Sequence, residues 1–393
     1  MIDYNKVLTD EIQSIKPSGI RKFFDMVDKA KGDPEIISLG IGEPDFTTPW
    51  HIRQAGIESL NRGETHYTSN AGLTEMREEA SKYLTRRFGI APYNHENEII
   101  ITVGGSEAID LTLRCLVNDG DEVIIPEPSF VCYQPLTRIT GGIPVVIETK
   151  NENEFRITAE ELKAAITPKT KLLVLPYPCN PTGAVMRHED LEAVAEILRD
   201  TNIMVLADEI YAELTYSRKH ESIVQFEGMR ERTVLISGFS KAYAMTGWRL
   251  GYLCTPEPIA KMMLKLHQYG IMSAPTMAQF AAIEALQDGD ADIEMMKDEY
   301  DSRRRFLLSE FKRMGLPCFD ACGAFYLFPD IRAFGLTSTD FCEKLFTEEK
   351  LAVIPGGAFG ESGEGFVRVC YAQSMKKIEE AVIRIERFIK KMK

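Results

Sequence analysis

Several patterns that mark common function classes are missing from this chain of 393 residues. Its eight cysteines form no CxxC pair and its six histidines form no HExxH pattern, so no zinc-binding motif is visible. The apolar runs are too short to span a membrane, and the start, MIDYNKVLTDEIQ, carries charges where a signal peptide needs an apolar core. These absences predict a protein of the reducing cytoplasm, without a catalytic metal and without a membrane partner.

Positive charge is also scarce. Lys and Arg number 46 against 59 Asp and Glu, which gives a formal net charge of −13, and no basic run stands out. A protein that follows the phosphate backbone of a nucleic acid needs such a run, so we expect no nucleic-acid partner. Neither a GxGxxG nor a GK[ST] loop is present, which gives dinucleotide or nucleoside triphosphate binding little support.

Five short apolar runs predict buried strands. Their β-branched content and unbroken apolarity are typical of a parallel sheet that is covered on both faces. Between two of these runs, residues 187–199 place their apolar side chains at the spacing of one helical face. Strands that alternate with helices predict an α/β fold with right-handed crossovers. The runs span residues 98–102, 122–125, 171–175, 203–206 and 233–236.

The pattern changes after about residue 285. Residues 294–314 predict a long charged helix, residues 325–328 a short strand, and the stretch from Met375 onward a terminal helix. We therefore expect a smaller α+β domain built from both chain ends, residues 1–45 and 285–393. Residues 46–284 would form the large domain.

Polar residues follow four of the predicted strands. In open α/β sheets, ligands bind beyond the carboxyl ends of the strands, so these residues are expected to converge on one site. They are Gly105 and Ser106 at a helix start, Asn180, Asp208 with Tyr211, and Lys241 with Arg249.

Each of these residues also has an ordinary structural interpretation. Ser106 and Asp208 could cap helices, and Asn180, which precedes a proline, could simply begin a turn. Tyr211 could be a packed aromatic residue, and Lys241 could be solvated. The functional interpretation rests on the combination rather than on any one residue.

The combination matches the chemistry of one cofactor. The free amides of a helix start and the planar guanidinium of Arg249 suit a phosphate. Lys241, among small and apolar residues, could act as an amine nucleophile. A buried Asp208 would need a cation such as a protonated ring nitrogen. Asn180 and Tyr211 supply donors for a phenolate-type oxygen, and the whole set describes pyridoxal 5′-phosphate.

With these residues identified, the chain resembles the class I/II aminotransferases of PLP fold type I over essentially its whole length. The segment GFSKAYAMTGWRLG (238–251) satisfies the family's lysine-attachment pattern at every constrained position. The resemblance implies a mostly parallel seven-stranded sheet flanked by helices. Further family segments occur in the family order: IGEPDF (41–46), HYTSNAGL (66–73), PSFVCY (128–133), NPTG (180–183), ADEIY (207–211) and GFVRVCYA (365–372).

The resemblance implies catalytic roles for three residues. Lys241 would form the Schiff base with pyridoxal phosphate and later move the substrate's α proton. Asp208 would pair with the pyridine nitrogen. Tyr211, together with Asn180, would hold the ring oxygen.

It also implies the remaining cofactor contacts. Phe130 would stack on the ring. A trans-acting residue would reach the phosphate from a partner subunit, which makes a homodimer the expected unit. The implied phosphate contacts are Gly105, Ser106, Ser240, Arg249 and the trans-acting Tyr67.

For the substrate, the resemblance implies that Arg368 binds the α-carboxylate, helped by the backbone at Gly42 and by Asn180. An exposed ion pair is the ordinary alternative for Arg368. Arg21 is a possible contact for the substrate side chain, although such an arginine is more often solvated.

Two departures from the family pattern matter. Many relatives have a serine three residues before the lysine, where this chain has Gly238, so the phosphate role of Ser240 is less secure than that of Arg249. The stretch 266–276 lacks the arginine that some aspartate-specific relatives bring across the dimer.

We expect a ping-pong aminotransferase that transfers an amino group from an L-amino acid to a 2-oxo acid. A pyridoxal-phosphate-dependent lyase, acting by C–S β-elimination or decarboxylation on the same scaffold, is the alternative. A non-catalytic regulator that binds the cofactor is a remote third hypothesis.

Overall fold

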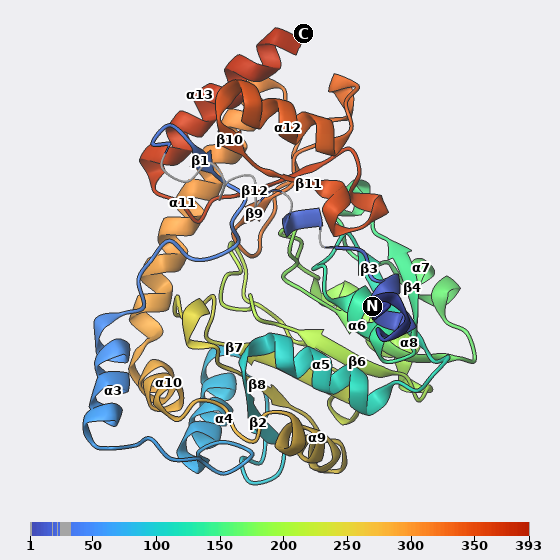
Figure 1. The fold of residues 1–393 in the computed structure, drawn as a ribbon, viewed down its shortest axis with the longest axis vertical. Coiled ribbons are helices and arrows are strands. Elements are labelled where there is room, and N and C mark those ends of the chain that lie inside the picture. Colours follow the sequence, from blue (N-terminus) through green and yellow to red (C-terminus); the bar gives the residue numbers. More distant parts are fainter. Residues whose placement is uncertain (1, 18, 22, 24–32, 393) are drawn as a thin grey trace.

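A seven-stranded sheet forms the centre of the protein. The computed structural model describes residues 2–17, 19–21, 23 and 33–392. The spatial strand order is β2–β8–β7–β6–β5–β3–β4, and β8 alone runs against the others (Figure 1). The strands are β2 (Ile99–Thr102), β3 (Glu122–Glu127), β4 (Ile143–Glu148), β5 (Thr170–Leu175), β6 (Met204–Asp208), β7 (Thr233–Gly238) and β8 (Gly251–Cys254).

The sheet confirms the predicted fold class. All five predicted strands are present, and their ends differ from the prediction by at most two residues. β4 and β8 were not among the predicted strands. The single antiparallel strand, β8, lies between β2 and β7, so the sheet is mostly parallel, as expected.

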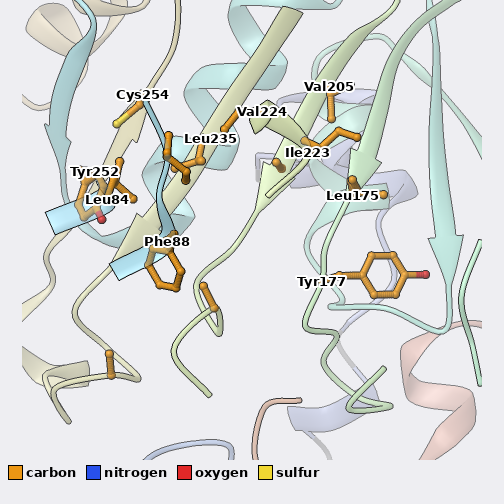
Figure 2. Packing of buried hydrophobic residues seen from close by; sticks show 14 of the residues in the cluster. Leu84, Phe88, Leu175, Tyr177, Val205, Ile223, Val224, Leu235, Tyr252 and Cys254 are labelled. Atoms are coloured by element: carbon orange, nitrogen blue, oxygen red, sulfur yellow. The ribbon is translucent and has the colours of Figure 1, made fainter. Parts of the chain in front are cut away.

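The unbroken apolar runs are explained by burial on both faces of the sheet. In β5, Leu172 and Val174 pack into one hydrophobic cluster, and Leu173 and Leu175 pack into another on the opposite face. Successive side chains of a strand point to opposite faces, so a strand covered on both sides must be apolar throughout. Figure 2 shows the second cluster at close range, with side chains from several neighbouring strands gathered in one layer.

Helices cover both faces. Side chains of α5, α6 and α9 join the cluster on one face, and side chains of α4, α8 and α10 join the cluster on the other. No helix of the described ranges is long and apolar enough to cross a membrane. The helices of this part are α3 (Trp50–Asn61), α4 (Thr74–Phe88), α5 (Gly104–Leu116), α6 (Tyr133–Ile139), α7 (Ala159–Ala165), α8 (His188–Arg199), α9 (Glu257–Gly270) and α10 (Thr276–Asp288).

The two chain ends meet in a second layer, at the top of Figure 1. A strand near the amino end, β1, pairs in parallel with β10, and β11, β12 and β9 form an antiparallel sheet. The strands are β1 (Ile37–Ser38), β9 (Tyr326–Leu327), β10 (Leu351–Ala352), β11 (Ile354–Pro355) and β12 (Val367–Cys370). The helices of this layer are α11 (Asp290–Met314), α12 (Ser338–Glu349) and α13 (Met375–Met392). The short helix α1 (Asp10–Ser14) instead contacts α6, beside the central sheet (Figure 1).

This second layer has its own hydrophobic core. Its cluster draws mainly on residues before 40 and after 295, with a few side chains from the segment after β6. The predicted long helix, short strand and terminal helix are all present there. The division into residues 46–284 and residues 1–45 plus 285–393 stays a proposal, which the separate cores support.

The sheet core makes a stability prediction with a matched control. Ile124 in β3 is fully buried, whereas Ile143 in the neighbouring β4 is 46% exposed. Ile124→Ala should lower the free energy of unfolding by about 2–5 kcal/mol, because it removes buried methyl groups and leaves a cavity. Ile143→Ala should cost less than about 1 kcal/mol, because that side chain already contacts water. Urea denaturation measures both, and equal losses would contradict burial as the cause.

Candidate active site

One cavity collects the predicted site residues. It measures about 370 Å³, within the range of about 300–1,000 Å³ that is typical of small-molecule sites. It is bordered by residues that follow several strands of the central sheet and by residues from both chain ends. All predicted site residues except Tyr67 line it: Gly42, Gly105, Ser106, Phe130, Asn180, Asp208, Tyr211, Ser240, Lys241, Arg249 and Arg368.

The start of α5 and Arg249 form the anion-favouring end of the cavity. β2 turns into α5 at Gly104, whose φ of +77° suits glycine. A Cβ atom on Gly104 would lie 2.8 Å from Nη2 of Arg249, and one on Gly251 would lie 2.8 Å from the backbone N of Gly105. The close approach brings the free amides of a helix start beside a guanidinium, which is a favourable site for a phosphate.

Asp208 is a buried carboxyl at the end of β6. It is 7% exposed, and burial raises its pKa. Two donors offset part of that effect: the hydroxyl of Tyr133 donates to Oδ2 at 2.7 Å, and the N–H of Ile210 donates to Oδ1 at 3.2 Å. Turns rather than a helix follow Asp208, so the helix-cap interpretation is wrong. A cationic ligand atom would suit this carboxylate.

Lys241 faces the cavity rather than bulk water. Its Nζ donates to the carbonyl of Gly42 at 2.7 Å and lies 5.5 Å from the ring centre of Tyr211. Burial lowers the pKa of Lys241 to about 8, and the nearby charge of Arg368 acts in the same direction. A substantial neutral fraction is therefore available near pH 8, as an amine nucleophile requires.

Arg368 is 2% exposed, so the exposed ion-pair interpretation is wrong. Nη1 donates to Oδ1 of Asn180 at 2.7 Å, and Nη2 donates to the carbonyl of Gly40 at 2.5 Å. The guanidinium lies 4.5 Å from the ring centre of Tyr326. Its Nε is buried and has no hydrogen-bond partner among the described residues, which leaves one donor free for a ligand such as a carboxylate.

The other predicted residues have different surroundings. The hydroxyl of Tyr211 is 2.7 Å from that of Tyr326. Tyr67 is 82% exposed and lies outside the cavity of its own chain. Ile20, rather than its neighbour Arg21, lines the cavity, and Arg21 is exposed.

Sequence reasoning missed three groups at this site. Tyr133 lies three positions after Phe130 in the quoted segment PSFVCY, and that spacing could have suggested a second residue on the same helix start. Tyr326 lies in a short apolar strand whose composition is typical of the hydrophobic core, so nothing in the sequence marks it as a site residue. The Gly40 carbonyl belongs to the backbone and leaves no trace in the sequence.

No group of three or more His, Cys, Asp or Glu side chains among the described residues could hold a metal ion. The donors of the cavity are instead amides, hydroxyls, an amine and guanidinium groups. This donor set suits an organic anion.

The Tyr133 contact makes a pH prediction for the cofactor-free protein. Because the folded chain raises the pKa of Asp208, it holds that proton to a higher pH than the unfolded chain does. Stability due to Asp208 is therefore lost as the pH rises from about 4 through the folded pKa. Tyr133→Phe removes a donor to the carboxylate and raises this pKa further, so the loss between about pH 4 and pH 7 should grow by about 1–3 kcal/mol.

Urea denaturation at several pH values measures this loss. Asp208→Asn serves as the background, because it removes the titrating group. In the Asp208→Asn background, Tyr133→Phe should change the free energy of unfolding by the same amount at about pH 4 and at about pH 7. An equal pH dependence with and without Asp208 would contradict the assignment.

Comparison with known proteins identifies the family. The model of the family "Aminotransferase class I and II" matches residues 34–385. A putative aminotransferase, YugH, of Bacillus subtilis is 51% identical, and an aspartate aminotransferase of Pyrococcus abyssi is 43% identical; both alignments cover at least 98% of each chain. The structure of an aromatic aminotransferase from Pyrococcus horikoshii superposes with a TM-score of 0.89 at 42% identity, covering 95% of this chain and 99% of that one.

The fold and the sequence therefore agree. The mostly parallel sheet with flanking helices is the PLP fold type I arrangement that the resemblance implied. This chain belongs to the class I and II aminotransferase family.

Proposed function

We propose that this aminotransferase uses pyridoxal 5′-phosphate to move an amino group from an L-amino acid to a 2-oxo acid in two half-reactions. The observation that carries the proposal is the convergence of Lys241, Asp208 and Arg249 on one cavity that Arg368 also lines.

The residues of the cavity fit this cofactor. The cradle formed by Gly105, Ser106 and Arg249 suits a phosphate, and the buried Asp208 lacks a cation that a protonated pyridine nitrogen would provide. The unpartnered Nε of Arg368 fits a carboxylate. When bound, the cofactor supplies an aldehyde that condenses with amines and a ring that withdraws electrons from the substrate's α carbon.

On the cofactor side, each residue has a defined task. Asp208 would hold a proton at the pyridine nitrogen, and Asn180 and Tyr211 would orient the ring oxygen. Phe130 would pack against the ring and exclude water from it. Ser240 and the start of α5 add donors to the phosphate cradle beside Arg249.

On the substrate side, Arg368 and Asn180 orient the α-carboxylate, and the backbone of Gly42 borders the same space. Lys241 lies between the two sides. Its lowered pKa makes it a suitable base, which would move a proton between the substrate's α carbon and the cofactor's C4′ carbon. The hydrogen bond from Lys241 Nζ to the carbonyl of Gly42 links this amine to the backbone segment that would border the substrate.

A half-reaction tests this function. Protein loaded with pyridoxal phosphate is mixed with one L-amino acid at a time, without a 2-oxo acid. We expect a good donor to yield one equivalent of its 2-oxo acid per subunit and no ammonia, because no acceptor regenerates the starting form. Lys241→Ala should slow this step by about 10²–10⁴-fold, since it removes the base. Lys376→Ala, an exposed lysine on α13, is the matched control.

Two outcomes contradict the proposal. Continuous release of 2-oxo acid with an equal amount of ammonia would indicate elimination. A protein that binds no pyridoxal phosphate, or that yields no 2-oxo acid from any amino acid, would exclude transamination.

We also propose that the functional unit is a homodimer. Tyr67, Tyr269, Ile271 and Met272 are 82%, 87%, 44% and 45% exposed, and we call them the tyrosine patch. The two segments of the patch are joined, because Nδ2 of Asn70 donates to the carbonyl of Met272 at 2.8 Å. Exposed clusters of large apolar side chains are typical of interfaces. A second subunit on this patch would allow Tyr67 to act in trans.

Charge placed in the tyrosine patch tests the dimer. Tyr269→Asp should shift the protein from twice the chain mass toward the chain mass, because a carboxylate would be buried without a partner. Ile383→Asp, on the exposed face of α13, should leave the mass unchanged. Light scattering after size-exclusion chromatography measures both, and a wild-type monomer would contradict the proposal.

The proposed location is the cytoplasm. All eight cysteines are free, as is usual in a reducing compartment.

A further inference from the structure

A buried histidine contacts the helix that begins the phosphate cradle. His267, in the last turn of α9, is fully buried, and its Nδ1 lies 2.6 Å from Oε1 of Glu107 in the first turn of α5. The other oxygen of Glu107 accepts the backbone N–H of Val103 at 2.5 Å. One carboxylate thus joins α9 to the residue immediately before α5.

This contact does more than fill the core. Nε2 of His267 is buried and has no hydrogen-bond partner in the part of the chain that the structure describes, so burial removes this nitrogen from water without replacing the lost hydrogen bond. Glu107 is the one polar partner that the imidazole has among the described residues. A leucine would fill a similar volume without leaving a buried nitrogen unpartnered.

The location of Glu107 gives the contact a role at the anion site. Glu107 follows Ser106, and a carboxylate so close to a bound phosphate would repel it unless its charge were directed elsewhere. Each oxygen of the carboxylate instead has a partner outside the cradle, Oε1 at His267 and Oε2 at the N–H of Val103.

The same carboxylate also fixes the turn into α5. Val103, at the N-cap position, makes no side-chain cap, and Glu107 accepts its N–H instead. Gly104 then turns with a positive φ against Arg249. A freely moving Glu107 would leave this turn, and the amides beyond it, less well ordered.

We propose that His267 and Glu107 are positioning residues for the phosphate cradle, and that they raise the affinity of the protein for phosphorylated ligands. This inference rests on the proposed function, because it takes the phosphate of pyridoxal phosphate as the group that the cradle binds.

Binding measurements on the full-length protein test the pair. His267→Leu should weaken the binding of pyridoxal phosphate and of inorganic phosphate by about tenfold or more, the usual effect of losing a hydrogen bond to a charged group. The binding of pyridoxal, which lacks the phosphate, should change much less. His267→Asn should restore most of the affinity, since its amide N–H can donate from nearly the place of Nδ1.

His220→Leu is the matched control. His220 is also buried and also contacts a buried glutamate, with 2.9 Å between Nε2 and Oε2 of Glu209, but it lies outside the phosphate cradle. This variant should leave the ratio of pyridoxal phosphate to pyridoxal affinity unchanged. If His267→Leu does not fold, His267→Gln replaces it in the test. The glutamine amide lies one bond further along the side chain than Nδ1 does, so this variant should also lose the preference for pyridoxal phosphate over pyridoxal.

The inference is wrong if the His267 variants weaken pyridoxal phosphate and pyridoxal equally, or if His267→Asn behaves like His267→Leu. It is also wrong if His267→Leu retains full affinity for phosphate while wild-type protein transaminates. A wild-type protein that binds no pyridoxal phosphate would instead contradict the proposed function itself.

Discussion

The parallel pairing of β5, β6 and β7 determines which side chains can meet in this protein. Their common direction brings three strand ends to one edge of the sheet, so residues far apart in the sequence become neighbours there. Asn180, Asp208 and Lys241 each follow or end one of these strands. The antiparallel β8 returns along β7 and places Arg249 beside the start of α5.

The electrostatics of the site follow from burial. A carboxyl, an amine and a guanidinium are each withdrawn from water, and each keeps part of its hydrogen-bonding or charge-pairing capacity unused. An apolar cavity would be more stable without them. The proposed cofactor would account for their persistence, because it carries a cationic ring atom, an aldehyde and a phosphate in one molecule. Without a ligand, the hydroxyl of Tyr133 stabilises the Asp208 carboxylate and the carbonyl of Gly42 stabilises the Lys241 amine.

The parts of this structure that could be predicted are those with a strong local signal. The unbroken apolar runs of β5 and β6 predicted the sheet, and the residues after them predicted most of the cavity. β8 was missed because it begins at Gly251 and lies within a segment broken by glycine. β4 was missed because it contains a proline and is partly exposed at the sheet edge.

Other features depend on contacts that no single segment encodes. Tyr133 and Tyr326 have the composition of core residues, and only their neighbours show that their hydroxyls bond to Asp208 and Tyr211. Ile20 rather than Arg21 lines the cavity, and this depends on how the amino-terminal segment packs against the rest of the protein. The proposed role of Tyr67 depends on a second chain.

The order of the site residues along the chain has a consequence for biosynthesis. The residues proposed to bind the cofactor within one subunit lie between Gly105 and Arg249, in the part of the chain that builds the central sheet. Arg368, which is proposed to bind the substrate's carboxylate, lies on β12, whose partners β9 and β11 also come late in the chain. A ribosome therefore completes the residues proposed to bind the cofactor well before it reaches Arg368, so the proposed cofactor site is synthesised before the proposed carboxylate site.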